Sequence, residues 1–178
     1  TITFAQKNDS INKLQDVFIN GVRSGKTTPV TEKTIYRNDI QKTYQGTEVS
    51  SLLSKTPNVT ISSDNGTQFG YTYFRLRGID QTKINMTLNG VPLNEPEDQG
   101  VFFSNLPNFT DNIQSIEIQR GVGTSTNGVS SFAGSINFNS PNGFDKGGSV
   151  KYTTGSFNTN KVSATYSTGL NRNLELYT

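Results

Sequence analysis

Alternating apolar and polar residues predict several short, half-buried strands in this chain. The segments SIEIQR (residues 115–120) and GSINFN (134–139) carry isoleucine or phenylalanine at every second position, with polar residues between them. Because successive side chains of a strand point to opposite faces, each segment has one dry and one wet face. Asn89 and Gly90 both tolerate positive φ, so they predict a tight hairpin turn between two such strands. Further strands are expected at residues 30–36, 59–61, 74–77, 84–88 and 91–93.

Two short helices are expected between the first strands. Asn38 or Asp39 is a candidate cap for a helix that carries Ile40 and Tyr44. A second helix is expected to start near Thr47, with a glutamate in its first turn. Its apolar residues, in TEVSSLLSKTP, recur at i, i+3 and i+4, and the proline ends it.

Longer alternating segments follow near the C-terminal end of the sequence. Residues 147–155 and 161–169 each alternate cleanly and are separated by the turn SFNTN, and a third strand begins at Leu174. Strands of about 9 to 11 residues with one apolar and one polar face, joined by short turns, are typical of outer-membrane barrels. Three strands cannot close a barrel, and an open edge in lipid leaves backbone groups unpaired. We therefore expect the chain to be a truncated part of a larger protein.

The composition is polar without being highly charged. Hydrophobic residues, without glycine, make up 31% of the 178 residues and charged residues 17%, against about 45 to 50% apolar with glycine included and about a quarter charged in ordinary soluble proteins. The net charge of +2 and the scattered Lys and Arg provide no basic stripe for nucleic acid. The chain has no histidine and no cysteine, which excludes His-based catalysis, zinc sites and thiol chemistry.

Five blocks in order resemble the plug domain of TonB-dependent outer-membrane receptors. They are LQDVFING, LLSKTPNVTI, FRLRGID, INMTLNGVPLN and the long segment NIQSIEIQRGVGTSTNGVSSFAGSINFNS. The resemblance implies an α+β plug domain, a small mixed four-stranded sheet with short helices, followed by the first antiparallel strands of a large transmembrane β-barrel. The implied divisions are residues 1–5 as a signal-peptide remnant or a frayed end, 6–29 as a flexible segment with a TonB box, 30–143 as the plug and 147–178 as barrel strands.

The resemblance also implies a function and a place in the cell. The plug lies in the lumen of a barrel of about 22 strands in the outer membrane of a Gram-negative bacterium. It gates energised uptake of a scarce siderophore, cobalamin or glycan, so the protein is a transporter and not an enzyme, with no cofactor and no metal. Implied partners are TonB with ExbB and ExbD, the protein's own barrel, membrane lipid, the small-molecule or oligosaccharide ligand and a surface lipoprotein. The alternative is a partner-binding or signalling module of an outer-membrane complex without transport of its own.

The N-terminal segment contains the residues that match the TonB box by position. β-augmentation needs a free, extended, partly apolar segment on a flexible tether. Such a segment is formed here by Asp16, Val17, Phe18 and Ile19. The alternative is that residues 18–23 fold back as a hairpin at Asn-Gly.

Two arginines match the family residues that pair with glutamates on the barrel wall. They are Arg77 in LRG and Arg120 in QRG. A guanidinium taken into a lumen needs a carboxylate partner, because breaking a buried pair from one side costs about 3 to 5 kcal/mol. The alternative is that both lie on the wet face of the plug sheet, with Arg77 on the same strand face as Arg75.

Ligand contacts are expected from loops that face outward, since loops on a rigid scaffold commonly carry binding. Aromatic residues there can stack on a chelator or a sugar, or can pack against the plug or barrel instead. The acidic loop at residues 95–98 has no acid-base partner for glycoside hydrolysis and lacks the spacing of a calcium loop. The alternative that it is simply a solvated loop remains open. The candidate ligand residues are Gln68, Tyr71, Tyr73, Asp80, Gln81, Asn94, Glu95, Phe102 and Phe103.

Overall fold

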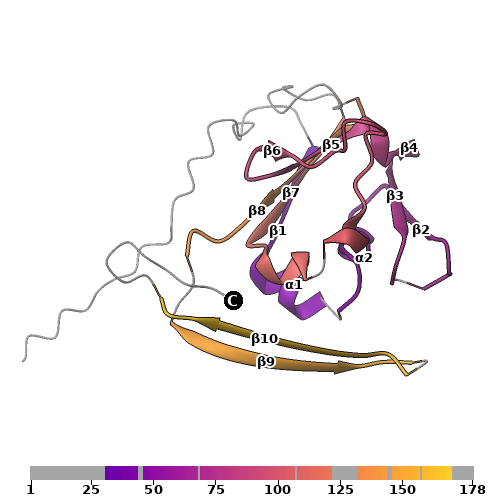
Figure 1. The fold of residues 1–178 in the computed structure, drawn as a ribbon. Coiled ribbons are helices and arrows are strands. Elements are labelled where there is room, and N and C mark those ends of the chain that lie inside the picture. Colours follow the sequence, from indigo (N-terminus) through magenta and orange to yellow (C-terminus); the bar gives the residue numbers. More distant parts are fainter. Residues whose placement is uncertain are drawn as a thin grey trace, which may run out of the picture.

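The fold consists of a plug-like body of two sheets with short helices and a separate long hairpin beneath it (Figure 1). No helix in the described part of the chain is long and apolar enough to cross a membrane. The computed structural model describes residues 31–43, 46–67, 69–106, 108–121, 132–143, 146–156 and 158–169.

The larger sheet has five strands in the order β1-β7-β8-β5-β6. The β5 and β8 strands are parallel and the other neighbours are antiparallel, so the sheet is mixed, as predicted. Its strands are β1 (Thr31–Tyr36), β7 (Ser115–Arg120), β8 (Gly134–Asn139), β5 (Ile84–Leu88) and β6 (Val91–Pro92).

A second sheet of three strands lies beside the first, in the order β2-β3-β4. It contains β2 (Val59–Ser63), β3 (Thr72–Leu76) and β4 (Ile79–Asp80), all antiparallel. The prediction of one four-stranded sheet was therefore wrong. The tight turn at Arg77 and Gly78 sends the chain back along β3, so β3 pairs within its own meander and not with the larger sheet.

The predicted α-helices are present but begin at other residues. The first, α1 (Arg37–Thr43), follows β1 without a break, which puts Asn38 and Asp39 inside its first turn, so the prediction that one of them caps the helix was wrong. The second, α2 (Val49–Leu53), has Glu48 as its N-cap without a side-chain cap bond. Tyr44 lies outside the described residues.

Three short 3₁₀ turns complete the plug, and the sequence pattern predicts none of them. They connect strands where the chain changes direction, and a single turn is too short to show a helical period. These turns are η1 (Gln81–Lys83), η2 (Phe103–Asn105) and η3 (Phe109–Asn112).

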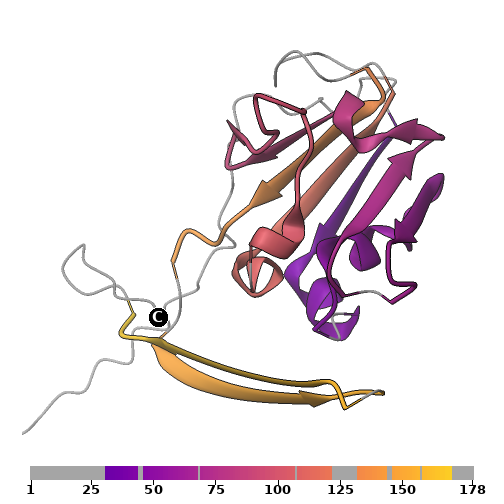
Figure 2. The same ribbon diagram turned by 45° about the vertical axis from the view of Figure 1, so that its right-hand side comes forward.

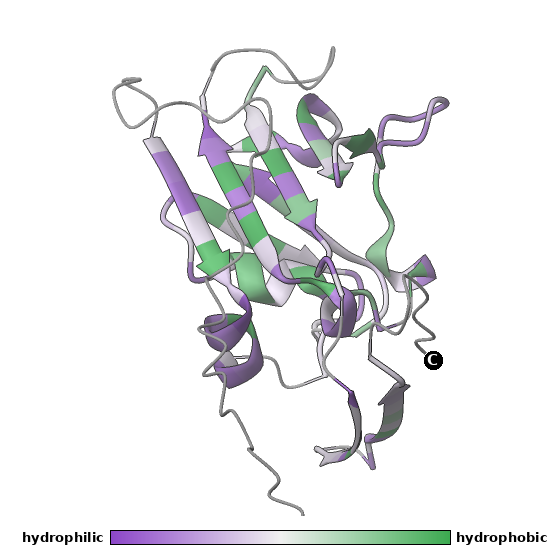
Figure 3. Cartoon of the chain, turned by 90° about the vertical axis from the view of Figure 1, so that its left-hand side faces the viewer, coloured by the Kyte–Doolittle hydropathy of each residue, from purple (hydrophilic) through white to green (hydrophobic). Residues whose placement is uncertain are grey.

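The core forms where the apolar face of the larger sheet meets the helices and β3. Figure 3 shows the strands of this sheet striped with hydrophobic and hydrophilic residues, as the alternation predicts. Phe103, Phe109 and Phe138 pack together there, with ring centroids 5.1 to 5.6 Å apart. Further buried members are Ile40, Val49, Leu52, Leu53, Phe74, Leu76, Ile84, Met86, Ile116, Ile118 and Ile136.

The predicted hairpin between β5 and β6 is confirmed. Asn89 and Gly90 have φ of 51° and 84°, as a two-residue turn of this kind requires. Asn89 also binds the chain beyond β8, since its Nδ2 donates to Ser140 Oγ at 2.8 Å and its Oδ1 accepts from Ser140 N at 2.9 Å. This turn therefore fixes the exit of the chain from the larger sheet.

Two long antiparallel strands, β9 (Gly147–Thr154) and β10 (Asn160–Ser167), form the separate hairpin. Their predicted alternation is confirmed, because the apolar side chains are exposed on one face: Val150 77%, Tyr152 67% and Val162 69%. Figure 2 shows the hairpin running below the end of the plug that carries α1. The predicted strand at Leu174 lies outside the described residues.

Candidate functional site

Arg77 occupies the tight turn between β3 and β4. The prediction that it lies on the polar face of β3 with Arg75 was therefore wrong. Arg77 and Gly78 have φ of 55° and 79°. Positive φ is uncommon for a residue other than glycine, asparagine or aspartate. The turn holds the Arg77 backbone in place, since its N–H donates to Asn58 O at 2.8 Å.

Arg77 and Arg120 converge at one end of the plug. The Arg120 Nη1 donates weakly to Pro57 O at 3.4 Å, beside the Asn58 carbonyl that binds Arg77. Gly121, with φ of 92°, leaves room for the Arg77 guanidinium, because a Cβ there would lie 2.9 Å from Arg77 Nη1. The structure therefore gathers the two predicted lock residues around one loop.

The charge of this arginine pair is not balanced within the described part of the chain, where neither guanidinium contacts a carboxylate. Arg120 Nε is buried without a hydrogen-bond partner among the same residues. A buried N–H of a cation that lacks an acceptor costs free energy. The geometry at this end of the plug thus suits an anionic group.

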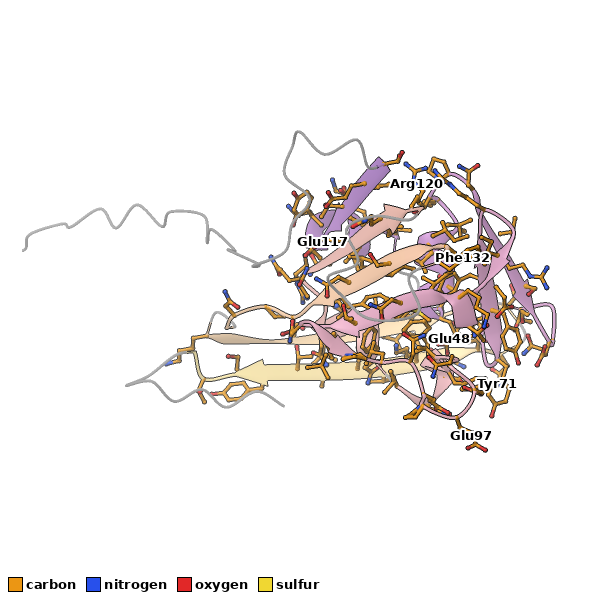
Figure 4. All side chains as sticks on the ribbon, turned by 90° about the horizontal axis from the view of Figure 1, so that it is seen from above. Glu48, Tyr71, Glu97, Glu117, Arg120 and Phe132 are labelled. Carbon is orange, nitrogen blue, oxygen red and sulfur yellow. The ribbon has the colours of Figure 1, made fainter. Side chains whose placement is uncertain are left out.

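An aromatic pair with an exposed edge lies at a different surface of the plug. Tyr71 and Phe102 meet edge to face, with ring centroids 6.1 Å apart and planes at 88°, and Tyr71 is 53% exposed. Glu95 in the neighbouring acidic loop is exposed as well. Figure 4 shows Tyr71 and Glu97 on one side of the plug and Arg120 on the opposite side. Of the predicted ligand residues, Tyr71 and Glu95 are therefore exposed, and Phe102 is half-buried.

Tyr73 lies close to a carboxylate that the sequence analysis did not single out. Its hydroxyl donates to Asp64 Oδ2 at 3.3 Å. Partial removal from water and then the negative charge of Asp64 raise the pKa of the Tyr73 hydroxyl. Tyr73 therefore remains a neutral donor at physiological pH. The turn signal at Asn65-Gly66 marks this loop, but nothing in the sequence shows that Asp64 meets Tyr73.

The other described candidates for ligand binding differ in exposure and in the contacts that they make within the plug. Gln81 and Phe103 are each 3% exposed and do not face outward, and Phe103 belongs to the aromatic core. Asp80 Oδ1 accepts from Thr82 N at 3.0 Å and so caps η1. Asn94 replaces a strand partner: it accepts from Met86 N at 2.8 Å and donates to two carbonyls. The outward orientation predicted for Gln81 and Phe103 was wrong, whereas Asp80 is exposed and Asn94 is half-buried.

Two further predictions fall on residues that the structure leaves undescribed. Gln68 and the segment Asp16, Val17, Phe18 and Ile19 lie outside the described residues. Where the structure does describe the chain, no group of three His, Cys, Asp or Glu side chains could hold a metal ion.

Comparison with known proteins identifies the family of this fold. A family model of the TonB-dependent receptor plug domain matches residues 24–135, more than half of the chain. The chain belongs to this family. Family membership places the chain in the outer membrane with its plug inside a barrel, as the resemblance of the sequence implies.

Solved TonB-dependent receptors share the plug fold at low sequence identity. The FrpB iron transporter from Neisseria meningitidis is 17% identical with a TM-score of 0.62, over 82% of this chain and 23% of that protein. The ferric-catecholate import receptor Fiu from E. coli K12 is 20% identical with a TM-score of 0.56, over 79% and 19%. The ferric yersiniabactin uptake receptor FyuA from Yersinia pestis is 18% identical with a TM-score of 0.52, over 78% and 21%.

The chain spans about a fifth of the length of these receptors. A search of curated proteins finds no match.

Proposed function

We propose that this chain is the plug and first barrel strands of a TonB-dependent transporter, which gates energised uptake of a siderophore, a cobalamin or a glycan. Residues 1–5 are assigned to a signal remnant, 6–29 to the TonB-binding segment, 30–143 to the plug and 147–178 to a barrel of about 22 strands. The observation that carries the proposal is the two-faced hairpin β9–β10 beside the plug.

The hairpin has the polarity that a barrel wall around a plug requires. Its apolar side chains, including Val150, Tyr152 and Val162, are exposed on the face away from the plug. Lys151 and Lys161 lie on the opposite face and reach Asp111 of the plug. In a transmembrane barrel the outer face is apolar and the lumen is polar, so this arrangement supports assignment of the outer face to lipid.

A lysine on the outer face of the hairpin tests this assignment directly. Val162→Lys is expected to destabilise the folded barrel by about 2 kcal/mol, because a charge on the lipid face loses its hydration. Thr165→Lys, on the polar face of the same strand, is the control and is expected to fold normally. The measurement is the fraction of full-length receptor in outer membranes that resists SDS without heating. Equal folded fractions for both variants would contradict the lipid-facing assignment.

The arginine end of the plug supports a lock against the barrel wall. Two guanidinium groups, those of Arg77 and Arg120, converge there without a carboxylate among the described residues. We assign their partners to barrel glutamates outside this chain. A charge-assisted pair holds a polar plug firmly and can still be exchanged for water when the plug moves.

The proposed ligand contacts come from the exposed Tyr71, its half-buried partner Phe102 and the exposed Glu95. A T-shaped aromatic pair offers a ring face for stacking on an aromatic chelator or on the apolar face of a sugar. The exposed carboxylate can accept hydrogen bonds from hydroxyl groups of either ligand. Tyr73, whose hydroxyl donates to Asp64, follows Tyr71 by two residues.

Transport itself is tested through the proposed TonB-binding segment. Deleting residues 16–19 is expected to abolish energised uptake and to leave ligand binding unchanged, because TonB, driven by ExbB and ExbD, can no longer add this strand to its sheet. The measurement is accumulation of radiolabelled ferric siderophores, cobalamin and oligosaccharides in cells that produce the full-length receptor, compared with surface binding at low temperature.

A deletion of equal length at residues 7–10, KNDS, is the matched control, because it shortens the same polar segment by the same amount. It is expected to transport normally. The alternative function, a partner-binding or signalling module without transport, predicts no specific accumulation even for the intact protein. Normal uptake after deletion of residues 16–19 would contradict the TonB-binding assignment.

A further inference from the structure

The plug and the hairpin meet through a charged contact at the end of the plug opposite the arginines. Asp111 of η3 lies close to two lysines from adjacent strands, with Lys151 Nζ 3.2 Å from Oδ1 and Lys161 Nζ 4.0 Å from Oδ2. The Asp111 side chain is only 9% exposed, against 48% and 28% for the lysines. A nearly buried carboxylate therefore receives positive charge from both strands of the hairpin.

The plug holds Asp111 in place through a contact across the sequence. Arg37, the first residue of α1, donates from Nη1 to Asp111 O at 3.0 Å and to Ile113 O at 2.9 Å. The Asp111 N–H donates to Asn108 O at 3.0 Å, which closes the 3₁₀ turn. Both the carbonyl and the N–H of Asp111 are therefore hydrogen-bonded within the plug. These bonds fix the turn from which the carboxylate reaches the hairpin.

The charge of Lys161 also acts on a second carboxylate of the plug, that of Glu48. Glu48 is half-buried, and this burial raises its pKa while the positive charge of Lys161 partly offsets the shift. Gly46 of the plug, with φ of 80°, faces the hairpin. A Cβ at this position would be 3.4 Å from Lys161 Cδ and 3.8 Å from Thr153 Cγ2. The plug surface thus combines two acidic groups with close backbone contact to the hairpin.

The hairpin presents its lysines on one face only. Lys151 pairs across the strands with Ser163, and Lys161 pairs with Thr153, so all four side chains lie on the polar face. A cavity of ≈ 270 Å³ separates this face from α1 and η3 and is lined by these four residues and Asp111. The contact is therefore charged, and the cavity beside it is large enough to admit water.

We propose that Asp111 forms an electrostatic latch that holds the plug on the first hairpin of the barrel. It follows that the resting plug is held at both ends, by its own cations at the Arg77 and Arg120 end and by its own anion at the Asp111 end. The inference rests on the proposed assignment of β9–β10 to the barrel wall. The latch needs no residue outside the described ones, in contrast to the arginine lock.

The cavity between plug and hairpin makes the latch measurable. The chain has no cysteine, so Ser163→Cys places a thiol in the cavity lining with no competing thiol within these 178 residues. In full-length receptor in outer-membrane vesicles, Asp111→Asn is expected to raise the labelling rate of this thiol by a water-soluble maleimide about three- to tenfold, as expected for loss of two partly exposed ion pairs. An unchanged rate would overturn the latch.

Two further variants separate the latch from a general loss of structure. Asp39→Asn removes an exposed carboxylate from α1, at the same end of the plug, and is expected to leave the labelling rate unchanged. Asp111→Lys combined with Lys151→Asp restores one ion pair with reversed charges and is expected to slow labelling again relative to Asp111→Lys alone. Failure of this exchange to slow labelling would refute a charge-based contact.

The labelling is done without ligand and without TonB, so its outcome is independent of transport. A receptor that fails to transport but shows the Asp111 effect would contradict the proposed function and retain the latch. A receptor that transports normally but shows no Asp111 effect would contradict the latch and retain the proposed function.

Discussion

Gly134→Ala is expected to destabilise the plug by about 4 kcal/mol. A Cβ at this position would overlap the carbonyl oxygen of Gln119 on β7 and would lie 2.9 Å from Leu76 Cδ2 in the core. Forcing such contacts costs about 3 kcal/mol, and the φ of 153° adds about 1 kcal/mol for a residue with a side chain. The measurement is calorimetric unfolding of the full-length receptor in detergent, where the plug transition is expected to fall by more than about 10 °C.

Gly147→Ala separates the steric conflict from the backbone strain. Gly147 also begins a strand and has a φ of 159°, but a Cβ there meets nothing within 4 Å. This variant is expected to shift the transition by no more than a few degrees. Equal shifts for the two variants would show that the overlap with Gln119 is relieved without cost, and that β8 is not held as tightly against β7 as its register indicates.

The parts of the fold with a strong local pattern can be predicted from the sequence. The strands β7, β8, β9 and β10 alternate over six to eight residues, and the Asn-Gly turn after β5 has the residues that its φ values require. In each case the physical reason is local, since side-chain alternation and turn conformation depend on neighbours in sequence.

The second sheet depends on features that have no such pattern. Its strand β4 has two residues, Ile79 and Asp80, which is too short to alternate. The turn that forms it places Arg77 at positive φ, where glycine or asparagine is usual. Because neither feature is typical of a hairpin, the sequence predicts one sheet where the plug has two.

The candidate ligand residues show why loop position alone does not predict exposure. Asn94 follows a strand in a polar segment, yet its amide bonds to backbone groups of Ile84, Met86 and Gln99 and closes the loop against β5. Phe103 follows the same loop and enters the core. The backbone groups of a loop that are taken from water need partners, and only the folded chain shows which side chain supplies them.

Only the lysines of the Asp111 latch can be predicted from the sequence. Lys151 and Lys161 fall on the polar face of their strands by simple alternation. Their acceptor depends on Arg37, which fixes Asp111 from a position 74 residues away. A contact over that separation leaves no periodic signal, so the sequence predicts the cations and not the carboxylate.

Arg120→Ala is expected to loosen the plug by about 3 kcal/mol, because it leaves the proposed barrel carboxylate without its partner. That change corresponds to more than about a hundredfold rise in the population of the displaced plug. The buried, unpartnered Nε and the long bond from Nη1 to Pro57 O indicate that the guanidinium is not held by the described residues alone. The measurement is passive conductance of the full-length receptor in planar bilayers, supported by sensitivity of cells to large antibiotics.

Arg75→Ala is the matched control for the lock, since it removes an exposed arginine from the neighbouring sheet and is expected to leave conductance unchanged. Arg120→Lys is expected to give an intermediate conductance, because lysine keeps the charge but cannot form a two-pronged bond with a carboxylate. A sealed channel in Arg120→Ala would assign the arginine to the wet surface of the plug. Equal leakage in Arg75→Ala and Arg120→Ala would show that any loss of charge loosens the plug, and the convergence of Arg77 and Arg120 would then have no specific role in holding it.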